Sequence, residues 1–449
     1  MTAASQLDGP NGPRLPNLSE LANGALERPP PQLDSYSYKE TTIKSPINTA
    51  LQDNTRWRKL WKHFTGSLDF DASDTLRLIA HLEKDRVTEA RRYRDWVDQV
   101  LVSHEGSSLK GLRIAFVLGK SNVAALNKWL YLAIVKRVQR LELDLSSADG
   151  CVGCTDSSFT FPSWLLHINF LDFTNFDRLT SLCLKSISIT EDDLAYFLSK
   201  CSLLEQLTVD NAAYLHKVRV AARQSLKLKH LEIRYCLKLE DVEVSARSVA
   251  SFKYAGPMIN INVPEFSSIS LAVKYCEMLF VKFPRIWSFS GLQQLELNLR
   301  VMEPSRSMSF PKDIPELSEL KQLELKFRVP ADHSILFLSS IMHACISSPA
   351  QYRVEWFWPL ETETLRSLED CEKEWKEQAG ENRHQSLKEI EFVGWIGLEK
   401  TDAQFAHYLM DSAISLEKLI LDFTSPCLIG KWHFWETPCI RRMIILGIY

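Results

Sequence analysis

The stretch LKHLEIRYC, which runs from Leu228 to Cys236, decides the fold of this chain. Its first, fourth and sixth residues are apolar and polar residues stand between them, so the stretch alternates with the period of a short strand. The pattern returns along the chain as LLEQLTV from Leu203, LQQLELNLR from Leu292, LKQLELKFR from Leu320 and LEKLILDF from Leu416. One copy cannot bury its own apolar face, so we expect the copies to stack on one another.

This recurring pattern is the core of a leucine-rich repeat. Stacked repeats place their leucines in one continuous core and leave the polar residues between them on an open inner face. We therefore predict an α/β fold, a curved leucine-rich-repeat solenoid or horseshoe with a strand and a helix in each repeat. The inner-face residues that we expect to contact a partner are His230, Glu232, Arg234, Gln294, Glu296, Asn298, Gln322, Glu324 and Lys326.

The spacing of the copies supports this prediction. Short helical pieces precede several of them, as in ITEDDLAYFLSKC, where Thr190 is placed to cap the helix. Cys236 and Cys276 fall at the ninth repeat position, where Asn or Cys is usual and where we expect the thiol to be buried. The residues that we assign to the fourth position of successive repeats are Leu182, Leu207, Leu231, Phe252, Leu271, Leu295 and Leu323.

Composition limits the class of protein. The chain has 449 residues, of which 45% are hydrophobic and 24% charged, a composition typical of globular proteins. Its formal net charge is −3, so no overall positive charge favours nucleic-acid binding. The first thirty residues lack the apolar region of a signal peptide, and no apolar stretch is long enough to span a membrane. Ten scattered cysteines favour reduced thiols. We expect a protein of the cytoplasm or nucleus, with no membrane partner.

No catalytic motif stands out. The chain has no P-loop, no G-x-G-x-x-G, no G-x-S-x-G and no H-E-x-x-H sequence. The pair Cys151 and Cys154 lacks the second pair that a structural zinc site needs, so we interpret it as part of a loop. A catalytic site assembled from residues that are distant in the sequence would not be visible as a motif. The sequence itself predicts no enzyme, no cofactor and no metal.

The stretch RWRKLWKHFTGSLDFD begins at Arg56, where the composition changes abruptly. Trp57, Leu60, Trp61 and Phe64 recur at helical spacing and predict a short helix with an apolar stripe. A helix that docks on a core is favoured, and stacking of these rings on single-stranded nucleic acid is the alternative. Two helices are expected from Leu76 to His104, a strand from Lys110, and a third helix from Val123 to about Lys136.

This order of elements and the sequence motifs within it resemble the plant F-box/leucine-rich-repeat family. The motifs are, in succession, RWRKLW, LDFD, WVDQVL, NKWLYLAI and RVQRLELDL. In that family the F-box docks on the Skp-type adaptor of a cullin–RING ubiquitin ligase, and the repeats hold the substrate. The resemblance implies that Trp57, Leu60 and Trp61 contact the adaptor. The opening F-box helices are not found upstream, so the F-box of this chain is incomplete.

The C-terminal part carries a second resemblance. The stretch SLKEIEFVGWIGLEKTDAQFAHYLMDSAISLEKLILD, from Ser386 to Asp422, is similar to the FBD domain that closes many proteins of the same family. It implies a cap on the open end of the solenoid. An acidic helix is expected from Glu361 to Glu381, with a solvated face favoured over a docking surface. The apolar run from Met443 to Ile448 is too short to cross a membrane; it packs on the last repeat or marks an altered C-terminus.

The predicted organisation has five parts. They are a disordered segment at 1–50, an F-box remnant at 51–75, the solenoid with its N-terminal helices at 76–345, an FBD-like cap at 346–426 and a divergent tail at 427–449. We expect a substrate-recognition subunit of an SCF-type E3 ubiquitin ligase, with an unknown protein as substrate. The alternatives are a repeat scaffold or decayed F-box protein that works without the adaptor, and a small-ligand receptor on the inner face.

Overall fold

A computed structural model describes the repeats and the elements that precede them. The described residues are 63–81, 84–147, 159–168, 176–221, 226–257, 259–263, 266–274, 291–300, 319–328, 351–357, 389–393, 412–422 and 443–447. The predicted disordered segment, the acidic helix, and the cysteines at 151 and 154 lie outside these ranges.

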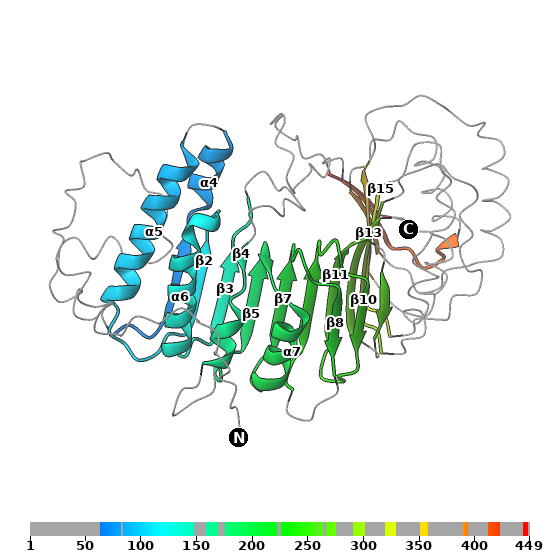
Figure 1. Ribbon diagram of the computed structural model, residues 1–449. Helices are drawn as coiled ribbons and strands as arrows, with labels where there is room; N and C mark the ends of the chain where they lie inside the picture. Colours follow the sequence, from blue (N-terminus) through cyan, green and yellow to red (C-terminus); the bar gives the residue numbers. More distant parts are fainter. Residues whose placement is uncertain are drawn as a thin grey trace, which may run out of the picture.

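One sheet of fourteen strands runs through the described chain and curves as it goes (Figure 1). Neighbouring strands are parallel, except that the last one, β19, pairs antiparallel with β18. In order across the sheet the strands are β1 (Ser67–Asp71), β2 (Gly111–Ala115), β3 (Arg140–Asp144), β5 (Ser181–Lys185), β7 (Gln206–Asp210), β9 (His230–Arg234), β11 (Ser251–Gly256), β13 (Ser268–Lys274), β14 (Gln294–Arg300), β15 (Gln322–Arg328), β16 (Gln351–Phe357), β17 (Glu389–Val393), β18 (Lys418–Asp422) and β19 (Met443–Gly447).

The remaining elements pack against the outer side of this sheet, as α6, α7, β8 and β10 do in Figure 1. The helices are α4 (Ser73–Ala80), α5 (Arg86–Ser103), α6 (Val123–Val135) and α7 (Glu191–Lys200), with 3-10 turns η1 (Lys120–Asn122) and η3 (Ser163–His167). The outer strands are β8 (Lys217–Val220), β10 (Asp241–Val244) and β12 (Asn260–Asn262), which form a small parallel sheet, and the pair β4 (Phe159–Thr160) and β6 (Ile187–Ser188).

The alternation in each inner strand explains the core. In β9, Leu231 and Ile233 are at most 1% exposed, whereas the polar residues between them stay partly or fully exposed. Parallel pairing aligns Leu231 with Leu207 on one side and Phe252 on the other, so the buried side chains form continuous stacks. The structure confirms the solenoid that the repeated pattern predicts.

The helices predicted between Leu76 and His104 and from Val123, and the strand predicted from Lys110, are confirmed as α4, α5, α6 and β2, whereas residues 56–62 of the predicted short helix lie outside the described residues. Helix α5 buries Tyr93, Val97 and Leu101 on one face, and α6 buries Trp129. The Tyr93 hydroxyl donates to the Phe70 carbonyl oxygen at 2.6 Å and accepts from the Ala115 amide at 3.1 Å, so it satisfies backbone groups of β1 and β2 inside the core. The Trp129 indole nitrogen donates to Asp98 at 2.7 Å, which joins α6 to α5.

The predicted cap of α7 is present. The Thr190 side chain accepts from the Asp193 amide at 3.2 Å, and the Asp193 carboxylate accepts from the Thr190 amide at 3.2 Å. These two bonds form a capping box, which satisfies donors at the helix start that the helix itself cannot bond.

The register corrects one repeat assignment. Ile269, not Leu271, pairs with Phe252 and Leu295, so Ile269 holds the fourth position of its repeat. Both residues are 1% exposed, and because the strand period is two, a shift by two residues leaves the apolar pattern unchanged. The ninth position of this repeat is therefore Lys274, and Cys276 does not occupy it.

The outer side differs from the predicted helix in each repeat. From β7 to β13 the first residues of successive strands are 206, 230, 251 and 268, so the repeats shorten from 24 to 21 and then 17 residues. A strand covers about 3.3 Å per residue and a helix about 1.5 Å, so the 21-residue repeat of β10 favours a strand on its outer side. The 24-residue repeat of β8 is only one residue shorter than the repeat that carries α7, so length does not explain its outer strand. The alternating KVRV and DVEV sequences of β8 and β10 suit a strand in both repeats.

The C-terminal strands continue the same sheet. β16, β17 and β18 extend it with parallel pairing, and β19 adds the apolar run that begins at Met443. The prediction that this run packs on the last repeat is confirmed. The likeness of residues 386–422 to an FBD cap stays a prediction.

Candidate partner-binding surface

Strand register arranges the residues of the inner face in three parallel rows. Strand pairing aligns the first, third and fifth residue of each five-residue strand core with the same positions in its neighbours. Among the predicted contact residues, the first row holds His230, Gln294 and Gln322, the second holds Glu232, Glu296 and Glu324, and the third holds Arg234, Asn298 and Lys326. All nine thus belong to one face, as the alternation of the repeats predicts.

The nine residues fall into two groups. Strand β9 carries three of them, and β14 and β15 carry the other six, with β11 and β13 between the groups. Residues of the intervening strands, which the sequence analysis did not select, occupy the same rows: Ser251, Lys253, Ala255, Ser268, Ser270 and Ala272. The weaker repeat copies that begin at Ser248 and Ser267 could have predicted these six residues, because their polar and small residues alternate with apolar ones.

Small side chains make β11 and β13 the open part of this face. Five of those six residues are Ser or Ala, and Lys253 is the one long side chain among them. Ser270 donates its hydroxyl to Glu296 at 2.6 Å, so the second row is linked across β13 and β14. The inner face thus carries mostly small side chains over β11 and β13, between the longer side chains of β9 and β14.

The N-terminal end of the inner face is a network of ion pairs. Arg113 of β2 lies 3.1 Å from Asp69, 2.7 Å from Asp71 and 3.3 Å from Glu142. Lys185 of β5 lies 3.1 Å from Glu142, so this carboxylate connects the two cations. Adjacent strands therefore satisfy one another's charges here.

The pKa shifts in this network reflect that mutual pairing. Burial opposes ionisation of Asp71, but hydrogen bonds from Ser73 and Arg113 outweigh it and lower the pKa of this carboxyl. Burial likewise opposes the charge of Lys185, and the Asp144 carboxylate at 3.0 Å outweighs it and raises the pKa of the amine. Both groups are therefore charged at neutral pH.

Arg234 of β9 is a charged residue of the inner face that lies farther along the sheet than the Arg113 network. Its guanidinium lies 3.6 Å from Glu232 and 4.0 Å from Asp210, which are longer than hydrogen bonds. Its side chain is 42% exposed. Arg113, Lys185 and Arg234 each have carboxylate neighbours, so these three cations do not form the unpaired cluster that an anionic cofactor would require.

Two of the three thiols in the described part of the chain, those of Cys201 and Cys236, are buried, and that of Cys183 is partly buried. Cys183, Cys201 and Cys236 are the cysteines within the described residues, and burial raises the pKa of each to about 12. Cys236 is 1% exposed, as its ninth repeat position predicts. Thiols in this protonated state are poor nucleophiles and poor metal ligands.

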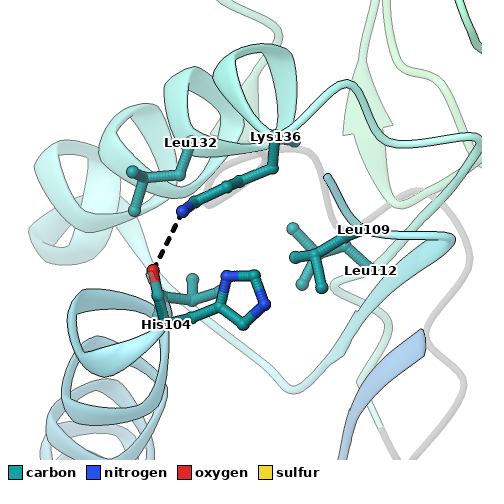
Figure 2. A pocket seen from close by; sticks show the side chains of 7 residues that line it. His104, Leu109, Leu112, Leu132 and Lys136 are labelled. Carbon is teal, nitrogen blue, oxygen red and sulfur yellow. Dashed lines mark hydrogen bonds between the residues drawn. The ribbon is translucent and has the colours of Figure 1, made fainter. Parts of the chain in front are cut away.

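A hollow between α5, β2 and α6 lies near the first strand (Figure 2). It is lined by Leu101, Leu109, Leu112, Leu132 and Ala133, with His104 and Lys136 at its polar side. The Lys136 amine donates to the His104 carbonyl oxygen at 2.9 Å and to the Gly106 carbonyl oxygen at 2.6 Å. The side chains leave no room for a water molecule, so this hollow is part of the core packing.

The predicted adaptor contacts Trp57, Leu60 and Trp61 lie outside the described residues. His63 is the first described residue after them, and hydrogen bonds of the next few residues fix the chain to the solenoid. The His104 ring nitrogen Nε2 lies 2.6 Å from the Phe64 carbonyl oxygen, and the Lys110 amide donates to the Gly66 carbonyl oxygen at 2.9 Å. Strand β1 then joins the sheet.

Two further observations concern sites of other classes. Within the described ranges, no three His, Cys, Asp or Glu side chains come together as a metal site would need. In the same part of the chain, no helix is both long and apolar enough to cross a membrane.

Comparison with known proteins places these features in context. A family model, the leucine-rich-repeat domain of At1g61320/AtMIF1, matches residues 100–441. The chain is also similar to the F-box/LRR-repeat protein At3g18150 of Arabidopsis thaliana, with 24% identity over 298 residues. That alignment covers 63% of this chain and 53% of the relative, so the chain matches about half of the relative's length.

Proposed function

The chain belongs to the leucine-rich-repeat domain family of At1g61320/AtMIF1, and from this premise we propose that it recognises protein substrates for an SCF-type ubiquitin ligase. A stacked-repeat solenoid is a protein-interaction module whose curved face binds a partner. In the proposed complex the repeats hold the substrate and an F-box remnant engages a Skp-type adaptor of a cullin–RING ligase. Ubiquitin transfer then depends on proximity and needs no catalytic group of this chain.

The observation that carries the substrate-binding half of this proposal is the alignment of polar side chains in rows on the inner face. In the described part of the chain, the helices and the outer strands lie on the opposite side of the sheet. The inner rows therefore remain accessible across many strands, as His230, Gln294 and Gln322 show. Such a surface offers hydrogen-bonding groups at the strand spacing of about 4.8 Å.

The adaptor half of the proposal rests on the resemblance of residues 56–71 to the end of an F-box and on the similarity of the chain to an F-box/LRR-repeat protein of Arabidopsis thaliana. The anchoring at Phe64 and Gly66 supports it, because the chain that leaves the proposed adaptor-binding helix is hydrogen-bonded to the solenoid. A fixed connection would hold a bound substrate at a defined position relative to the ligase. This orientation is what a proximity mechanism requires.

Co-purification with the adaptor tests the ligase proposal. The full chain is expressed with a recombinant plant Skp-type adaptor, beside a variant that carries Trp57→Ala and Trp61→Ala. We expect the adaptor to co-purify with the unchanged chain and to be lost from the double variant. Trp164→Ala is the matched control, because Trp164 lies in η3 of the solenoid and is 40% exposed.

The outcomes separate the ligase from the scaffold. If the unchanged chain retains no adaptor, the ligase proposal is wrong, and a repeat scaffold that acts without the adaptor remains. If Trp164→Ala removes the adaptor as strongly as the double variant does, the contact lies in the solenoid, and the assignment of Trp57 and Trp61 fails.

A further inference from the structure

Tyr235, the residue that follows β9, has a backbone conformation that its side chain does not favour. Its φ angle is 50°, in the left-handed region that mainly Gly and Asn adopt. The structurally equivalent residues after β5 and β7, Ser186 and Asn211, have the same left-handed conformation, with φ angles of 56° and 55°. Tyr235 is the bulky aromatic residue among these three; Phe116, which follows β2 and makes the same backbone bond, is outside the left-handed region and is buried.

The fold explains the conformation but not the aromatic ring. The Tyr235 amide donates to the Ala255 carbonyl oxygen at 2.5 Å, and the Asn211 amide donates to the Arg234 carbonyl oxygen at 2.8 Å. The same backbone bond thus recurs from strand to strand. Asn211 also uses its side chain for the fold, because its amide donates to the Ser186 hydroxyl at 3.1 Å. The Tyr235 side chain is instead 36% exposed.

The ring of Tyr235 has Arg234 as a charged neighbour, and the residues at the adjoining positions of the next strands are small. The Arg234 guanidinium carbon lies 5.4 Å from the centre of the Tyr235 ring, a cation–π contact. On the next two strands the adjoining residues are Ala255, Gly256 and Ala272, which are too small to cover the ring. A Cβ at position 256 would lie 3.0 Å from the Tyr254 hydroxyl, which is tighter than most contacts of this kind, so a larger residue there would require Tyr254 to shift.

A second exposed aromatic residue of the same kind lies on the loop after β7. Tyr214 is 49% exposed, and the Lys238 amine lies 4.9 Å from the centre of its ring. Leu237, beside Lys238, is 55% exposed. We call this group the tyrosine rim; its members are Tyr214, Arg234, Tyr235, Leu237 and Lys238.

We propose that the tyrosine rim anchors the protein partner of this chain and that it takes a peptide segment with an acidic side chain beside an apolar one. Tyr and Arg are the residues that most often carry the binding energy of protein interfaces. The charged members of the rim are both cations, so a carboxylate complements them, and an apolar side chain packs against Tyr214 and Leu237. The backbone cost of Tyr235 is then retained because the ring serves binding.

The acidic neighbours of the rim argue for a peptide rather than a nucleic acid. Asp210 and Glu232 lie beside Arg234 on the inner face and would repel a continuous phosphate backbone. A peptide can place one carboxylate at Arg234 and keep its other charges away. The inference rests on the proposed function, because it names the chemistry of the partner that the solenoid would bind.

Peptide selection on the full-length chain tests the inference. The immobilised chain is offered a phage-displayed library of random dodecapeptides, and the enriched peptides are measured by fluorescence polarisation. We expect a consensus with Asp or Glu next to a large apolar residue, and affinity about tenfold lower or more for Tyr235→Asn. Val87→Ser is the control that should leave affinity unchanged, because Val87 is 68% exposed and lies in α5.

Thermal unfolding of the same variant tests the strain argument. Tyr235→Asn should raise the melting temperature by about 1 to 3 °C, because Asn tolerates the left-handed conformation. A lower melting temperature would show that the ring serves the fold, and it would overturn the inference.

The binding outcomes separate this inference from the proposed function. Peptides that bind Tyr235→Asn as well as the unchanged chain, or that carry a basic consensus, would refute the rim as anchor and leave a protein-binding solenoid intact. Failure to enrich any peptide would count against both. A labelled oligothymidine that binds the chain through Tyr235 would assign the rim to single-stranded nucleic acid instead.

Discussion

Replacing Leu231 by Ala tests the stacked core on which the inner surface depends. Leu231 is 1% exposed and lies in register between Leu207 and Phe252. Burial of a leucine side chain is worth about 1.5 to 3 kcal/mol, and the cavity left behind adds to the loss. Strand pairing on both sides prevents the neighbours from closing the cavity, so we expect the free energy of unfolding to fall by about 3 to 5 kcal/mol.

Leu237→Ala is the matched control for this change. It removes the same atoms from the same repeat, but Leu237 is 55% exposed, so the expected loss is below about 1 kcal/mol. Urea unfolding of the full chain, followed by far-ultraviolet circular dichroism, measures both variants. The interaction between neighbouring repeats implies that the loss at Leu231 also affects the unfolding of the adjoining repeats.

Equal losses for the two leucines would refute the reasoning. They would mean that Leu231 is not enclosed by its neighbouring strands and that the continuous stack of the solenoid is absent. A gradual transition in the unchanged chain, without cooperative unfolding, would lead to the same conclusion.

Three further changes test single elements. Thr190→Ala should lower the free energy of unfolding by about 1 kcal/mol in urea titration, because it removes the capping box of α7. Tyr93→Phe should cost about 1 to 3 kcal/mol by the same measurement, because the Phe70 carbonyl and the Ala115 amide lose a buried partner. Burial lowers the pKa of His104, although the hydrogen bond to Phe64 opposes the shift. The unfolded chain therefore binds the proton more readily, and stability should fall as the pH drops below about 6.5 towards the lowered pKa. The urea midpoint at pH 5.5 and 7.5 should differ less in His104→Gln than in the unchanged chain.

The ion pairs of the inner face divide it into two parts. In one part the charged side chains bind one another, and in the other they are more available to a partner. Around Arg113 the charges of β1, β2 and β3 satisfy one another at 2.7 to 3.3 Å. A partner would have to compete with these bonds. Over β11 and β13 the side chains are small, and Arg234 lies farther from its carboxylates. The small residues of β11 lie next to Arg234 of the tyrosine rim on β9, so one partner segment could contact both.

Several elements could be predicted because their signals are local. The two-residue alternation of LKHLEIRYC specifies a strand with one buried face, and the buried stripe around Tyr93 and Val97 specifies an amphipathic helix. The Thr190 cap likewise depends on residues three positions apart. These features need only the covalent geometry of the chain and the difference between apolar and polar side chains.

Other features depend on which strands become neighbours. The register that selects Ile269 over Leu271 is set by pairing across the sheet, because both residues fit the alternation equally well. The outer strand β10 suits the shorter length of its repeat, whereas the repeat of β8 is nearly as long as the one that carries α7. The Arg113 network joins residues 29 to 44 positions apart in the sequence, and no local pattern links them.

The sequence by itself thus determined that this protein is a leucine-rich-repeat solenoid and which residues line its inner face, since period and spacing are properties of the chain alone. The tertiary structure decided how those residues meet. Stacking placed small residues between the two predicted groups and left the ring of Tyr235 exposed beside Arg234. The small residues are aligned by hydrogen bonds between strands that are distant in the sequence, and the exposure of the Tyr235 ring depends on what packs around it, so the sequence pattern reveals neither.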